Sequence, residues 1–545
     1  MAVTGAELVG QALKRLGVDT FFYIMGAPML QAEKACLDLG LRGIDVRHEQ
    51  AAAMMAHAYA RLRNVPGVCM ACSGPGVLNL GTGLGNALVD CAPVVALGGS
   101  SPVKEYGIGA FQEFDQLAAM KPLTKWAERV YETRRIPEFI ATAFRLATAG
   151  KPGPVYLDLP GDVLFASIDE ADVVWPAPLG ERPRPAADPV QIAKAIAMLE
   201  AAERPVVISG SGILWSDAPA AMTDWIEHTS MPFYTTPQGR GVVPEDHRCA
   251  SPNARSAALR EADLVLVLGT RLNYVFGHGK PPRFAKDTKL IRIDIDPGEI
   301  ASTPQVTLGI CADVRVALGQ LLAAAGGLGG DRYAAWMQRL ASIEAEKGPA
   351  AEAALATDQM PIHPLRLCKE VRDFLPRDAI LCVDGQEILN YGRQTIPTHT
   401  PGHRLNSGPF GIMGVGLPFG LGAKAAKPDK MVLVLHGDGS FGLNGMELDT
   451  AVRHGLPVIT VISLNGGWTA DPKREKPGRE LGYTRFDEMA KALGCHGEYV
   501  ERPEDIRPAL DRAAQAVAKG QPALVNVVTD WQARAQTVRF SASST

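Results

Sequence analysis

Short apolar runs, each followed by a Gly- or Pro-containing turn and a helical stretch, recur along the whole chain. Such runs are continuous rather than alternating, which is typical of parallel strands that helices cover on both faces. The pattern starts again after a Pro-rich linker at 181–189 and after an Ala- and Gly-rich stretch near 323–331. We therefore predict an α/β fold of three doubly wound parallel-sheet domains. The predicted domains cover residues 1–185, 186–350 and 351–545, and the clearest strand runs are 21–24, 93–97, 154–159, 205–209, 263–268, 379–384, 431–436 and 457–462.

The length, charge and cysteine content of the chain narrow the class of protein. A chain of 545 residues is long enough for about three domains of ordinary size. The net charge of −4 gives no indication of binding to nucleic acid or to an anionic membrane. Nine cysteines without a regular spacing favour a reducing compartment, and Cys69 and Cys72 lie in an apolar run that predicts a buried strand. With no signal-peptide pattern and no long uncharged apolar segment, we expect a cytoplasmic protein.

A glycine-flanked aspartate follows one predicted strand directly, and an asparagine ends the next strand. The first is Asp438 in Gly437-Asp438-Gly439, and the second is Asn465. Strand, helix and strand geometry brings such residues to neighbouring strand ends, where open α/β sheets bind ligands. A carboxylate, an amide oxygen and a backbone carbonyl are hard ligands that suit Mg²⁺, and a helix N-terminus attracts phosphate. Gly-Asp-Gly alone is more often a plain turn, but the asparagine at this distance favours a metal and diphosphate site.

With this spacing the segment resembles the signature of the thiamine-diphosphate enzyme superfamily, Gly-Asp-Gly followed by Asn-Asn. Leu464 stands where the first Asn is usual, but the metal ligand in that family is the second Asn, which Asn465 retains. The resemblance implies thiamine diphosphate and Mg²⁺ as cofactors. It implies Asp438, Asn465 and the carbonyl of Gly467 as metal ligands, and Gly437, Gly439, Ser440, Gly466 and Trp468 as residues that contact the cofactor.

The same resemblance implies a glutamate at a strand end in the N-terminal domain, and Glu49 is there, at the start of an Ala-rich helix. Its carboxylate would favour the imino tautomer of the aminopyrimidine, which removes the C2 proton of the thiazolium. The alternative is a first-turn glutamate that interacts with the helix dipole. The loop 410–416 resembles the one that holds the pyrimidine through Gly411 and Met413, although a lone Met more often fills a core. In the superfamily one site joins two subunits, so we expect a homodimer or homotetramer.

Three further segments resemble the group of 2-hydroxyacyl-CoA lyases and oxalyl-CoA decarboxylases: 253–284, 401–408 and 109–116. This resemblance implies CoA contacts by Arg255, Ser256, Arg404 and Asn406. Guanidinium groups form bidentate, charge-assisted hydrogen bonds with phosphate, whereas a surface salt bridge is the alternative for each arginine alone. ADP or CoA is expected in the central domain. The partial glycine fingerprint at 209–213 is compatible with FAD or NAD binding, but a tight turn explains it equally well.

Gln112 distinguishes the two CoA families, because oxalyl-CoA decarboxylases usually carry Tyr-Glu in place of Phe111-Gln112. A neutral amide orients a hydroxyl or carbonyl oxygen without placing a negative charge beside it. We therefore expect a 2-hydroxyacyl-CoA lyase in which Gln112 is catalytic and Phe111 contacts substrate. Ala27 replaces a bulkier residue of the animal lyases, which indicates a roomier pocket and a branched substrate such as 2-hydroxyisobutyryl-CoA, as in actinobacterial lyases of this group.

The expected reaction cleaves the C1–C2 bond of a 2-hydroxyacyl-CoA to formyl-CoA and an aldehyde or ketone, and is reversible. One alternative is a CoA-independent carboligase, because 115–120 and 124–127 also resemble benzaldehyde lyase. Oxalyl-CoA decarboxylase and acetolactate synthase are further alternatives, and a non-catalytic cofactor-binding regulator is one from another class. The tail at 533–539 either closes over the site or forms a solvated face.

Overall fold

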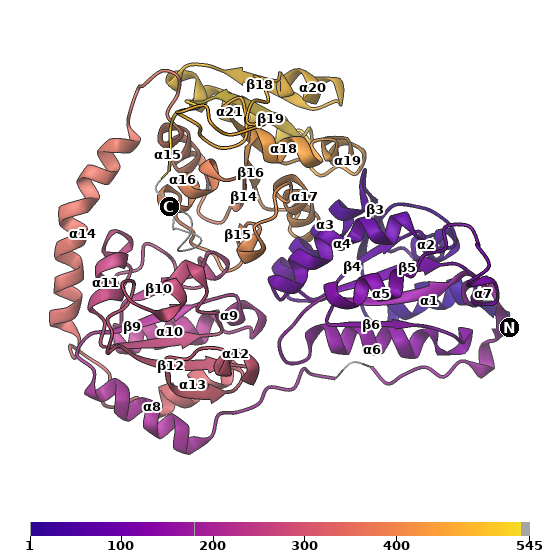
Figure 1. The fold of residues 1–545 in the computed structure, drawn as a ribbon, viewed down its shortest axis with the longest axis horizontal. Helices are drawn as coiled ribbons and strands as arrows, with labels where there is room; N and C mark the ends of the chain where they lie inside the picture. Colours follow the sequence, from indigo (N-terminus) through magenta and orange to yellow (C-terminus); the bar gives the residue numbers. More distant parts are fainter. Residues whose placement is uncertain (1, 179, 536–545) are drawn as a thin grey trace.

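The computed structural model describes residues 2–178 and 180–535. Three parallel sheets, each flanked by helices, form three units that follow one another along the chain (Figure 1). A short antiparallel pair, β1 (Ala2–Thr4) with β8 (Ser167–Asp169), joins the start of the N-terminal unit to its end. The predicted α/β fold of three doubly wound parallel-sheet domains is confirmed.

The N-terminal unit contains a six-stranded sheet in the order β3-β2-β4-β5-β7-β6. The central strands β4, β5 and β7 are buried along their whole length, and their sequences are mostly apolar or small residues; the exception, Asp158 in β7, pairs with Arg129. The strands are β2 (Thr20–Tyr23), β3 (Arg42–Asp45), β4 (Gly67–Ala71), β5 (Val94–Ser100), β6 (Trp126–Arg129) and β7 (Val155–Pro160). The helices are α1 (Gly5–Arg15), α2 (Leu30–Asp38), α3 (Glu49–Arg63), α4 (Pro75–Val89), α5 (Gln116–Met120), α6 (Ile136–Thr148) and α7 (Gly161–Phe165).

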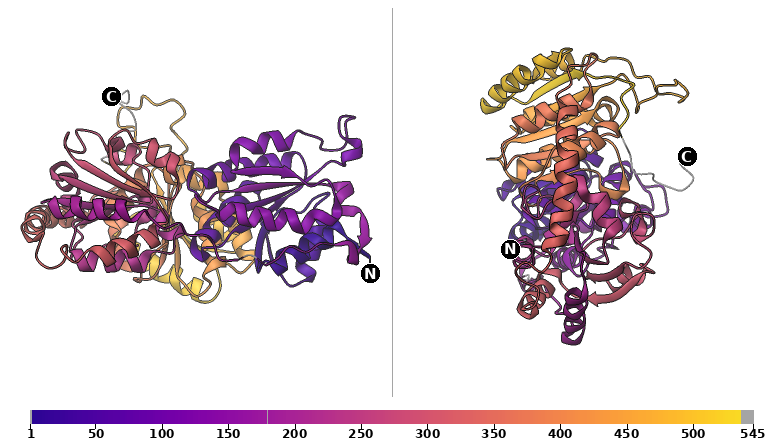
Figure 2. Two further views of the ribbon diagram at one scale, coloured as in Figure 1. Left: turned by 90° about the horizontal axis from the view of Figure 1, so that it is seen from below. Right: turned by 90° about the vertical axis from the view of Figure 1, so that its left-hand side faces the viewer.

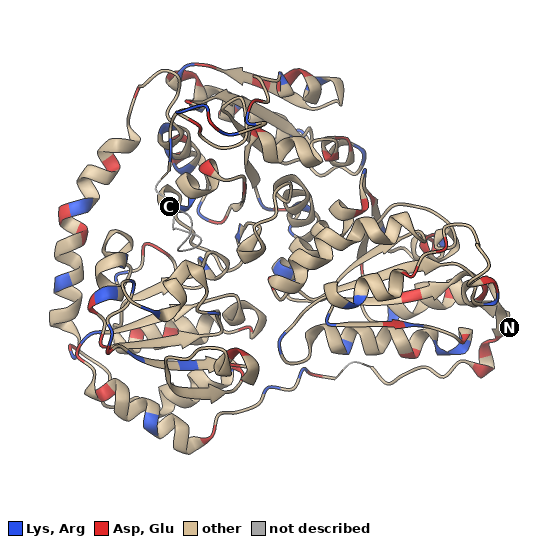
Figure 3. Ribbon diagram, viewed as in Figure 1, with Lys and Arg blue, Asp and Glu red and all other residues tan. Residues whose placement is uncertain are grey.

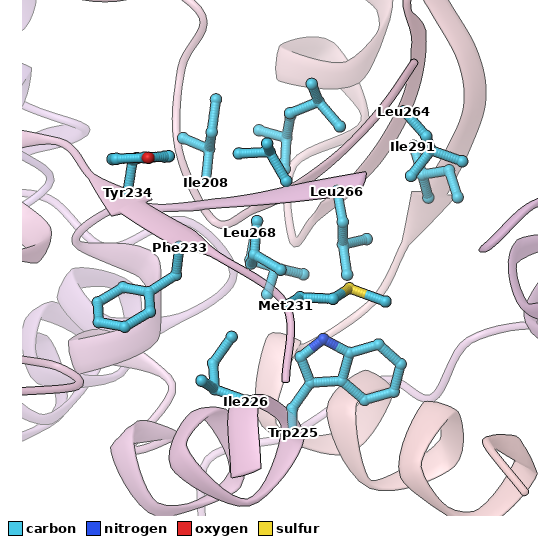
Figure 4. Packing of buried hydrophobic residues seen from close by; sticks show 14 of the residues in the cluster. Ile208, Trp225, Ile226, Met231, Phe233, Tyr234, Leu264, Leu266, Leu268 and Ile291 are labelled. Carbon is cyan, nitrogen blue, oxygen red and sulfur yellow. The ribbon is translucent and has the colours of Figure 1, made fainter. Parts of the chain in front are cut away.

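The central unit has a five-stranded sheet in the order β10-β9-β11-β12-β13. Trp225 and Ile226 pack beneath Leu266 and Leu268 of β11 in its core (Figure 4). The strands are β9 (Pro205–Ser209), β10 (Phe233–Thr235), β11 (Leu264–Leu268), β12 (Lys289–Asp294) and β13 (Val306–Cys311). The helices are α8 (Pro189–Ala201), α9 (Gly212–Trp215), α10 (Pro219–Thr229), α11 (Arg255–Glu261), α12 (Pro297–Ala301) and α13 (Val314–Ala324).

A helix of 22 residues, α14 (Ala334–Leu355), connects the central unit to the C-terminal unit along one side of the molecule (Figures 1 and 2). The C-terminal sheet has the order β15-β14-β16-β17-β19-β18. Its strands are β14 (Ile380–Asp384), β15 (Arg404–Leu405), β16 (Val432–Gly437), β17 (Ile459–Leu464), β18 (His496–Val500) and β19 (Ala523–Val528). Its helices are α15 (Pro364–Phe374), α16 (Glu387–Thr395), α17 (Gly416–Ala426), α18 (Asp438–Asn444), α19 (Glu447–Arg453), α20 (Phe486–Ala492) and α21 (Ile506–Ala518).

The N-terminal and C-terminal units meet where α3 packs against α17. A Cβ on Gly422 of α17 would lie 2.4 Å from the carbonyl oxygen of Met55 in α3, so the two backbones touch. Acidic and basic residues are distributed over all three units (Figure 3). Within residues 2–178 and 180–535, no helix is long and apolar enough to cross a bilayer.

The predicted tail segment at 533–539 lies only partly within the described residues. Ala533 and Ala535 are buried, and the N–H of Ala535 donates to Glu387 Oε2 at 2.9 Å. The start of this segment is therefore packed on α16 rather than solvated. Residues 536–539 lie outside the described residues.

Burial of one carboxyl group makes the stability of the N-terminal unit depend on pH. Glu33 in α2 is 1% exposed, and burial raises its pKa to about 8, although the N–H of Gly26 opposes the rise. Because the folded protein then holds a proton that the unfolded chain releases near pH 4.5, stability falls as the pH rises from about 4.5 to about 8.

Glu33→Gln removes this titration. The free energy of unfolding of the variant, relative to that of wild type, should therefore increase by up to about 4 kcal/mol between pH 5 and pH 8. The measurement is the thermal unfolding midpoint at both pH values. Glu128→Gln, on an exposed position of β6, serves as the matched control. An equal shift of the midpoint at pH 5 and pH 8 would contradict a buried neutral carboxyl group.

Candidate functional site

The aspartate and the asparagine of the predicted metal site lie side by side. Asp438 follows β16 directly, Asn465 follows β17, and these two strands pair in parallel. The N–H of Gly467 donates to both side chains, at 3.0 Å to Asp438 Oδ2 and at 3.2 Å to Asn465 Oδ1. Because one N–H reaches both oxygens, the two side chains face the same small space.

The donor groups at this point fit a hard divalent cation. Asp438 and Asn465 are buried, and burial raises the pKa of Asp438 to about 6 although the N–H groups of Gly439 and Gly467 oppose the rise. A bound cation stabilises a carboxylate that is short of compensating charge. Among the residues that the structure describes, no three His, Cys, Asp or Glu side chains form a metal-binding group. One carboxylate, one amide and one carbonyl suit Mg²⁺, which shares its shell with phosphate oxygens.

Glycines surround this pair and let other groups approach the backbone. A Cβ on Gly439 would lie 2.5 Å from the ring of Trp468, so the indole packs directly on the turn. Gly466 has a φ of +72°, which favours glycine. The Ser440 hydroxyl donates to the carbonyl of Gly437 at 3.0 Å and holds the turn closed. The residues predicted to contact the cofactor therefore lie on two adjacent segments, the start of α18 and the loop after β17, and the contact itself stays a prediction.

The loop predicted to hold the pyrimidine joins the short 3₁₀ helix η8 (Gly408–Phe410) to α17. Met413 is 38% exposed, so it does not fill a core. Gly411 has a φ of +70°, and a Cβ there would meet nothing within 4 Å. The carbonyl of Gly414 accepts from Asn444 Nδ2 at 2.7 Å, which fixes the loop to α18. The loop is thus anchored at one end and presents Gly411 and Met413 to open space.

Glu49 is the first residue of α3 and is buried, at 8% exposed. Asn79 Nδ2 of α4 donates to Glu49 Oε2 at 2.9 Å. A Cβ on Gly76 would lie 3.4 Å from Glu49 Oε1, so α4 leaves just enough room for the carboxylate. A first-turn glutamate that only interacts with the helix dipole would not need an amide to orient it. The surroundings therefore favour a functional carboxylate over the alternative.

The turn that carries Glu49 is fixed to the C-terminal unit of the same chain. Gln50 Nε2 donates to Asn444 Oδ1 at 2.9 Å. The N–H of His48 donates to Glu447 Oε1 at 3.2 Å, and burial raises the pKa of Glu447 to about 7. The position of Glu49 is therefore determined by both units. Sharing of one site between two subunits stays a prediction.

Gln112 and Ala27 come together on the N-terminal unit, with Ser73 between them. Ser73 Oγ donates to Gln112 Oε1 at 2.9 Å, and the N–H of Ser73 donates to the carbonyl of Ala27 at 3.3 Å. Gln112 has a φ of +57°, a backbone conformation that residues other than glycine rarely adopt. Phe111 is 81% exposed and points away from the core. Backbone strain of this kind is common at functional sites, and it supports the predicted role of Gln112.

Arg255 begins α11, and its Nε is buried without a hydrogen-bond partner among the described residues. Burial, together with the nearby cations Arg283 and Arg393, lowers the pKa of Arg255 to about 10. In the part of the chain that the structure describes, none of these three guanidinium groups pairs with a carboxylate. Ser256 is exposed beside Arg255. Such a group of unpaired cations favours an anionic ligand over a surface salt bridge.

Arg404 and Asn406, by contrast, are used within the fold. Arg404 is 2% exposed and donates to the carbonyl of Ile396 at 3.3 Å, and burial lowers its pKa well below the usual value. Asn406 is 5% exposed, and its Oδ1 accepts from the N–H of Gly408 at 2.9 Å. Contact of either side chain with CoA stays a prediction, and in this structure neither is open to a phosphate.

A pocket lies where the three units meet. Asp90 contributes to it from the N-terminal unit, Gly212 and Arg271 from the central unit, and Arg393 and Gly408 from the C-terminal unit. The partial glycine fingerprint at 209–213 therefore borders a cavity, in addition to forming a tight turn.

Asn79 and Ser73 are candidate site residues that the sequence did not indicate. Each lies within hydrogen-bond distance of a predicted site residue, Asn79 of Glu49 and Ser73 of Gln112. The segment Ser73-Gly74-Pro75 that follows β4 was a usable signal, because a turn at a strand end precedes a helix there.

Comparison with known proteins identifies three domains. The description "Thiamine pyrophosphate enzyme, N-terminal TPP binding domain" matches residues 3–119, the central domain of the same enzymes matches 192–321 and their C-terminal TPP binding domain matches 389–527. The chain is 36% identical to "Probable acetolactate synthase" of Mycobacterium bovis, over 96% of this chain and 95% of that protein. It is 32% identical to "2-hydroxyacyl-CoA lyase" of Arabidopsis thaliana, over 99% and 98%, and 32% identical to "Oxalyl-CoA decarboxylase" of Escherichia coli, over 96% and 95%. The chain therefore belongs to the thiamine pyrophosphate enzyme family.

Proposed function

We propose that the protein is a 2-hydroxyacyl-CoA lyase that uses thiamine diphosphate and Mg²⁺. It cleaves the C1–C2 bond of a 2-hydroxyacyl-CoA to formyl-CoA and an aldehyde or ketone, and it catalyses the reverse condensation. The observation that carries this proposal is the group of unpaired guanidinium groups formed by Arg255, Arg283 and Arg393. Their combined charge suits the phosphates of CoA, which a substrate without CoA does not have.

The residues of this chain have separate tasks in the proposed reaction. The bound cofactor supplies a nucleophilic carbon and stabilises the negative charge left when the C1–C2 bond breaks. Glu49 holds a proton at the aminopyrimidine nitrogen, and Asp438, Asn465 and the carbonyl of Gly467 hold Mg²⁺ against the diphosphate. Gln112 orients the oxygen on C2 of the substrate. The small side chain of Ala27 leaves room for a branched group on the same carbon, as in 2-hydroxyisobutyryl-CoA.

The cavity between the units supplies a place for the nucleotide part of CoA or for ADP. Arg393 borders this cavity and also lowers the pKa of Arg255, so the cavity and the guanidinium group are neighbours. We propose a homodimer or homotetramer. Phe111 and Ile108, at 81% and 79% exposed, provide apolar surface beside Gln112 for a second copy to cover.

A second candidate is the condensation of 2-oxo acids, because relatives named acetolactate synthase reach 36% identity. That reaction needs no CoA phosphates, so it leaves the three unpaired arginines without a ligand. The experiment that separates these reactions incubates the protein with thiamine diphosphate, Mg²⁺ and, in separate assays, a panel of 2-hydroxyacyl-CoAs, oxalyl-CoA or pyruvate. Release of formyl-CoA supports the lyase, oxalyl-CoA turnover to formyl-CoA and CO₂ supports a decarboxylase, and consumption of pyruvate alone would end the proposal.

Arg255→Ala should raise the KM for the acyl-CoA substrate by about 10- to 100-fold, since a lost charge-assisted hydrogen bond costs about 1.5–3 kcal/mol. The kcat should change little, because the phosphates lie away from the reacting carbon. Steady-state kinetics at several substrate concentrations measure both. Arg260→Ala, at an exposed position of the same helix, is the matched control. An unchanged KM in Arg255→Ala would show that Arg255 does not bind CoA.

A further inference from the structure

Gln112 stands at the centre of a segment that the rest of the N-terminal unit holds rigidly. The carboxylate of Glu113 accepts from the N–H groups of Gly107 and Gly109, at 2.8 and 3.1 Å, and so folds the preceding loop onto itself. Ser101 Oγ donates to the carbonyl of Phe111 at 3.3 Å. The loop on both sides of Gln112 is therefore anchored. The positive φ of Gln112 is imposed by these contacts rather than by a local preference of the residue.

The turn that faces Gln112 is equally fixed. Gly74 has a φ of +61°, and a Cβ there would lie 2.7 Å from the carbonyl oxygen of Gln112, so only glycine permits this approach. The N–H of Gly74 donates to Gln116 Oε1 at 2.8 Å. Gln116 is 1% exposed, and its Nε2 lies 2.7 Å from each of the carbonyl of Gly99, Tyr156 Oη and Asp158 Oδ1. Gln116 thus ties the turn to two central strands of the sheet.

Ser73 presents its hydroxyl group from this fixed turn. The hydroxyl has one proton and two acceptors within reach, Gln112 Oε1 at 2.9 Å and the carbonyl of Ala27 at 3.5 Å. The carbonyl of Ala27 already accepts from the N–H of Ser73. The shorter contact is the stronger one, so the hydroxyl donates to Gln112. That choice assigns the amide oxygen of Gln112 to Ser73 and leaves its NH₂ group without a partner among the described residues.

We infer that Ser73 is a positioning residue that fixes Gln112 as a hydrogen-bond donor toward the substrate. The inference rests on the proposed function for the identity of the substrate oxygen. The NH₂ group then faces the oxygen on C2: it donates to the hydroxyl oxygen of the acyl-CoA and to the carbonyl oxygen of the aldehyde or ketone. In the condensation it polarises that carbonyl for attack. Gln112 does not accept the hydroxyl proton, so another group removes it.

Two variants of Gln112 distinguish a donor from an acceptor. Gln112→Glu replaces the NH₂ group by an oxygen that donates only when protonated. Its kcat/KM should be low at neutral pH and should rise as the pH falls toward the pKa of the new carboxyl group, relative to the profile of wild type. Gln112→Leu should be low at every pH. Activity of Gln112→Glu that instead increases with pH would show an acceptor and overturn the inference.

The role of Ser73 is tested by a double-mutant cycle. Ser73→Ala should lower kcat/KM by about 10-fold, the equivalent of one hydrogen bond, while Ser73→Thr, which keeps the hydroxyl, should restore most of it. In a Gln112→Ala background, Ser73→Ala should have no further effect, because Ser73 acts through Gln112. Additive losses would reveal a structural role and overturn the inference.

The assays use whichever substrate the protein turns over with thiamine diphosphate and Mg²⁺. If the protein consumes pyruvate but cleaves no 2-hydroxyacyl-CoA, the proposed function fails. The same variants of Ser73 and Gln112 are then assayed with pyruvate as substrate. If a 2-hydroxyacyl-CoA is cleaved but the cycle is additive, the inference fails and the proposed function stands. The two failures therefore give different results.

Discussion

Asp438→Ala is expected to abolish retention of thiamine diphosphate and, with it, turnover. Asp438 carries the one carboxylate of the proposed Mg²⁺ site, and Asn465 and a carbonyl alone supply no charge to hold a divalent cation against a diphosphate. The affinity for cofactor in the presence of Mg²⁺ should fall by at least about 100-fold, more than typical losses from residues that only support a metal ligand. Isothermal titration of the purified protein with thiamine diphosphate, at fixed Mg²⁺, measures the change directly.

Asp438→Asn separates charge from shape in the same experiment. The asparagine oxygen still accepts from the N–H of Gly467, so the turn should keep its fold while the cation loses its carboxylate. We expect Asp438→Asn to remain folded without cofactor and to lose affinity to a degree close to that of Asp438→Ala. Asp429→Asn, in an exposed turn of the same unit, should bind as wild type. Wild-type affinity of Asp438→Asn for the cofactor would show that this carboxylate does not hold a metal at the diphosphate site.

The sequence was sufficient for those features that depend on order along the chain. Continuous apolar runs separated by helices determined the parallel sheets, and a strand end followed by one helix and another strand end brought Asp438 next to Asn465. Glu49 is predicted in the same way, because it follows a strand and opens a helix. In each case the order of strand and helix brings the residue to a strand end, so spacing in the sequence carries the information.

The sequence was insufficient where a contact joins segments that are distant in the chain. Arg255 and Arg404 are equivalent in the sequence as phosphate ligands, but Arg404 lies in β15 and is 2% exposed, while Arg255 has no carboxylate partner among the described residues. Residue type reveals a charge but not its burial or its neighbours. The sequence does not indicate Asn79 and Ser73 for a related reason. Their partners, Glu49 and Gln112, lie 30 and 39 residues away in the chain, on other elements.

Glu49→Gln should lower kcat by about 100- to 10,000-fold, the usual contribution of a positioned acid or base. An amide neither takes nor gives a proton at neutral pH, so the aminopyrimidine loses its proton-transfer partner. The shape of the site is kept, because the Gln oxygen still accepts from Asn79 Nδ2. Cofactor affinity should therefore stay within a few-fold of wild type, which distinguishes this variant from Asp438→Ala.

The rate of deuterium exchange at C2 of the bound cofactor, followed by NMR after acid quench, tests the role of Glu49 before any substrate is added. It should slow in Glu49→Gln to the same degree as kcat, since both depend on the same proton transfer. Asn79→Ala should give an intermediate rate, because it leaves the carboxylate in place but removes the amide that orients it. Glu128→Gln, which alters an exposed glutamate, controls for loss of charge. If exchange in Glu49→Gln proceeds at the wild-type rate, the carboxylate at the start of α3 acts on something other than the cofactor.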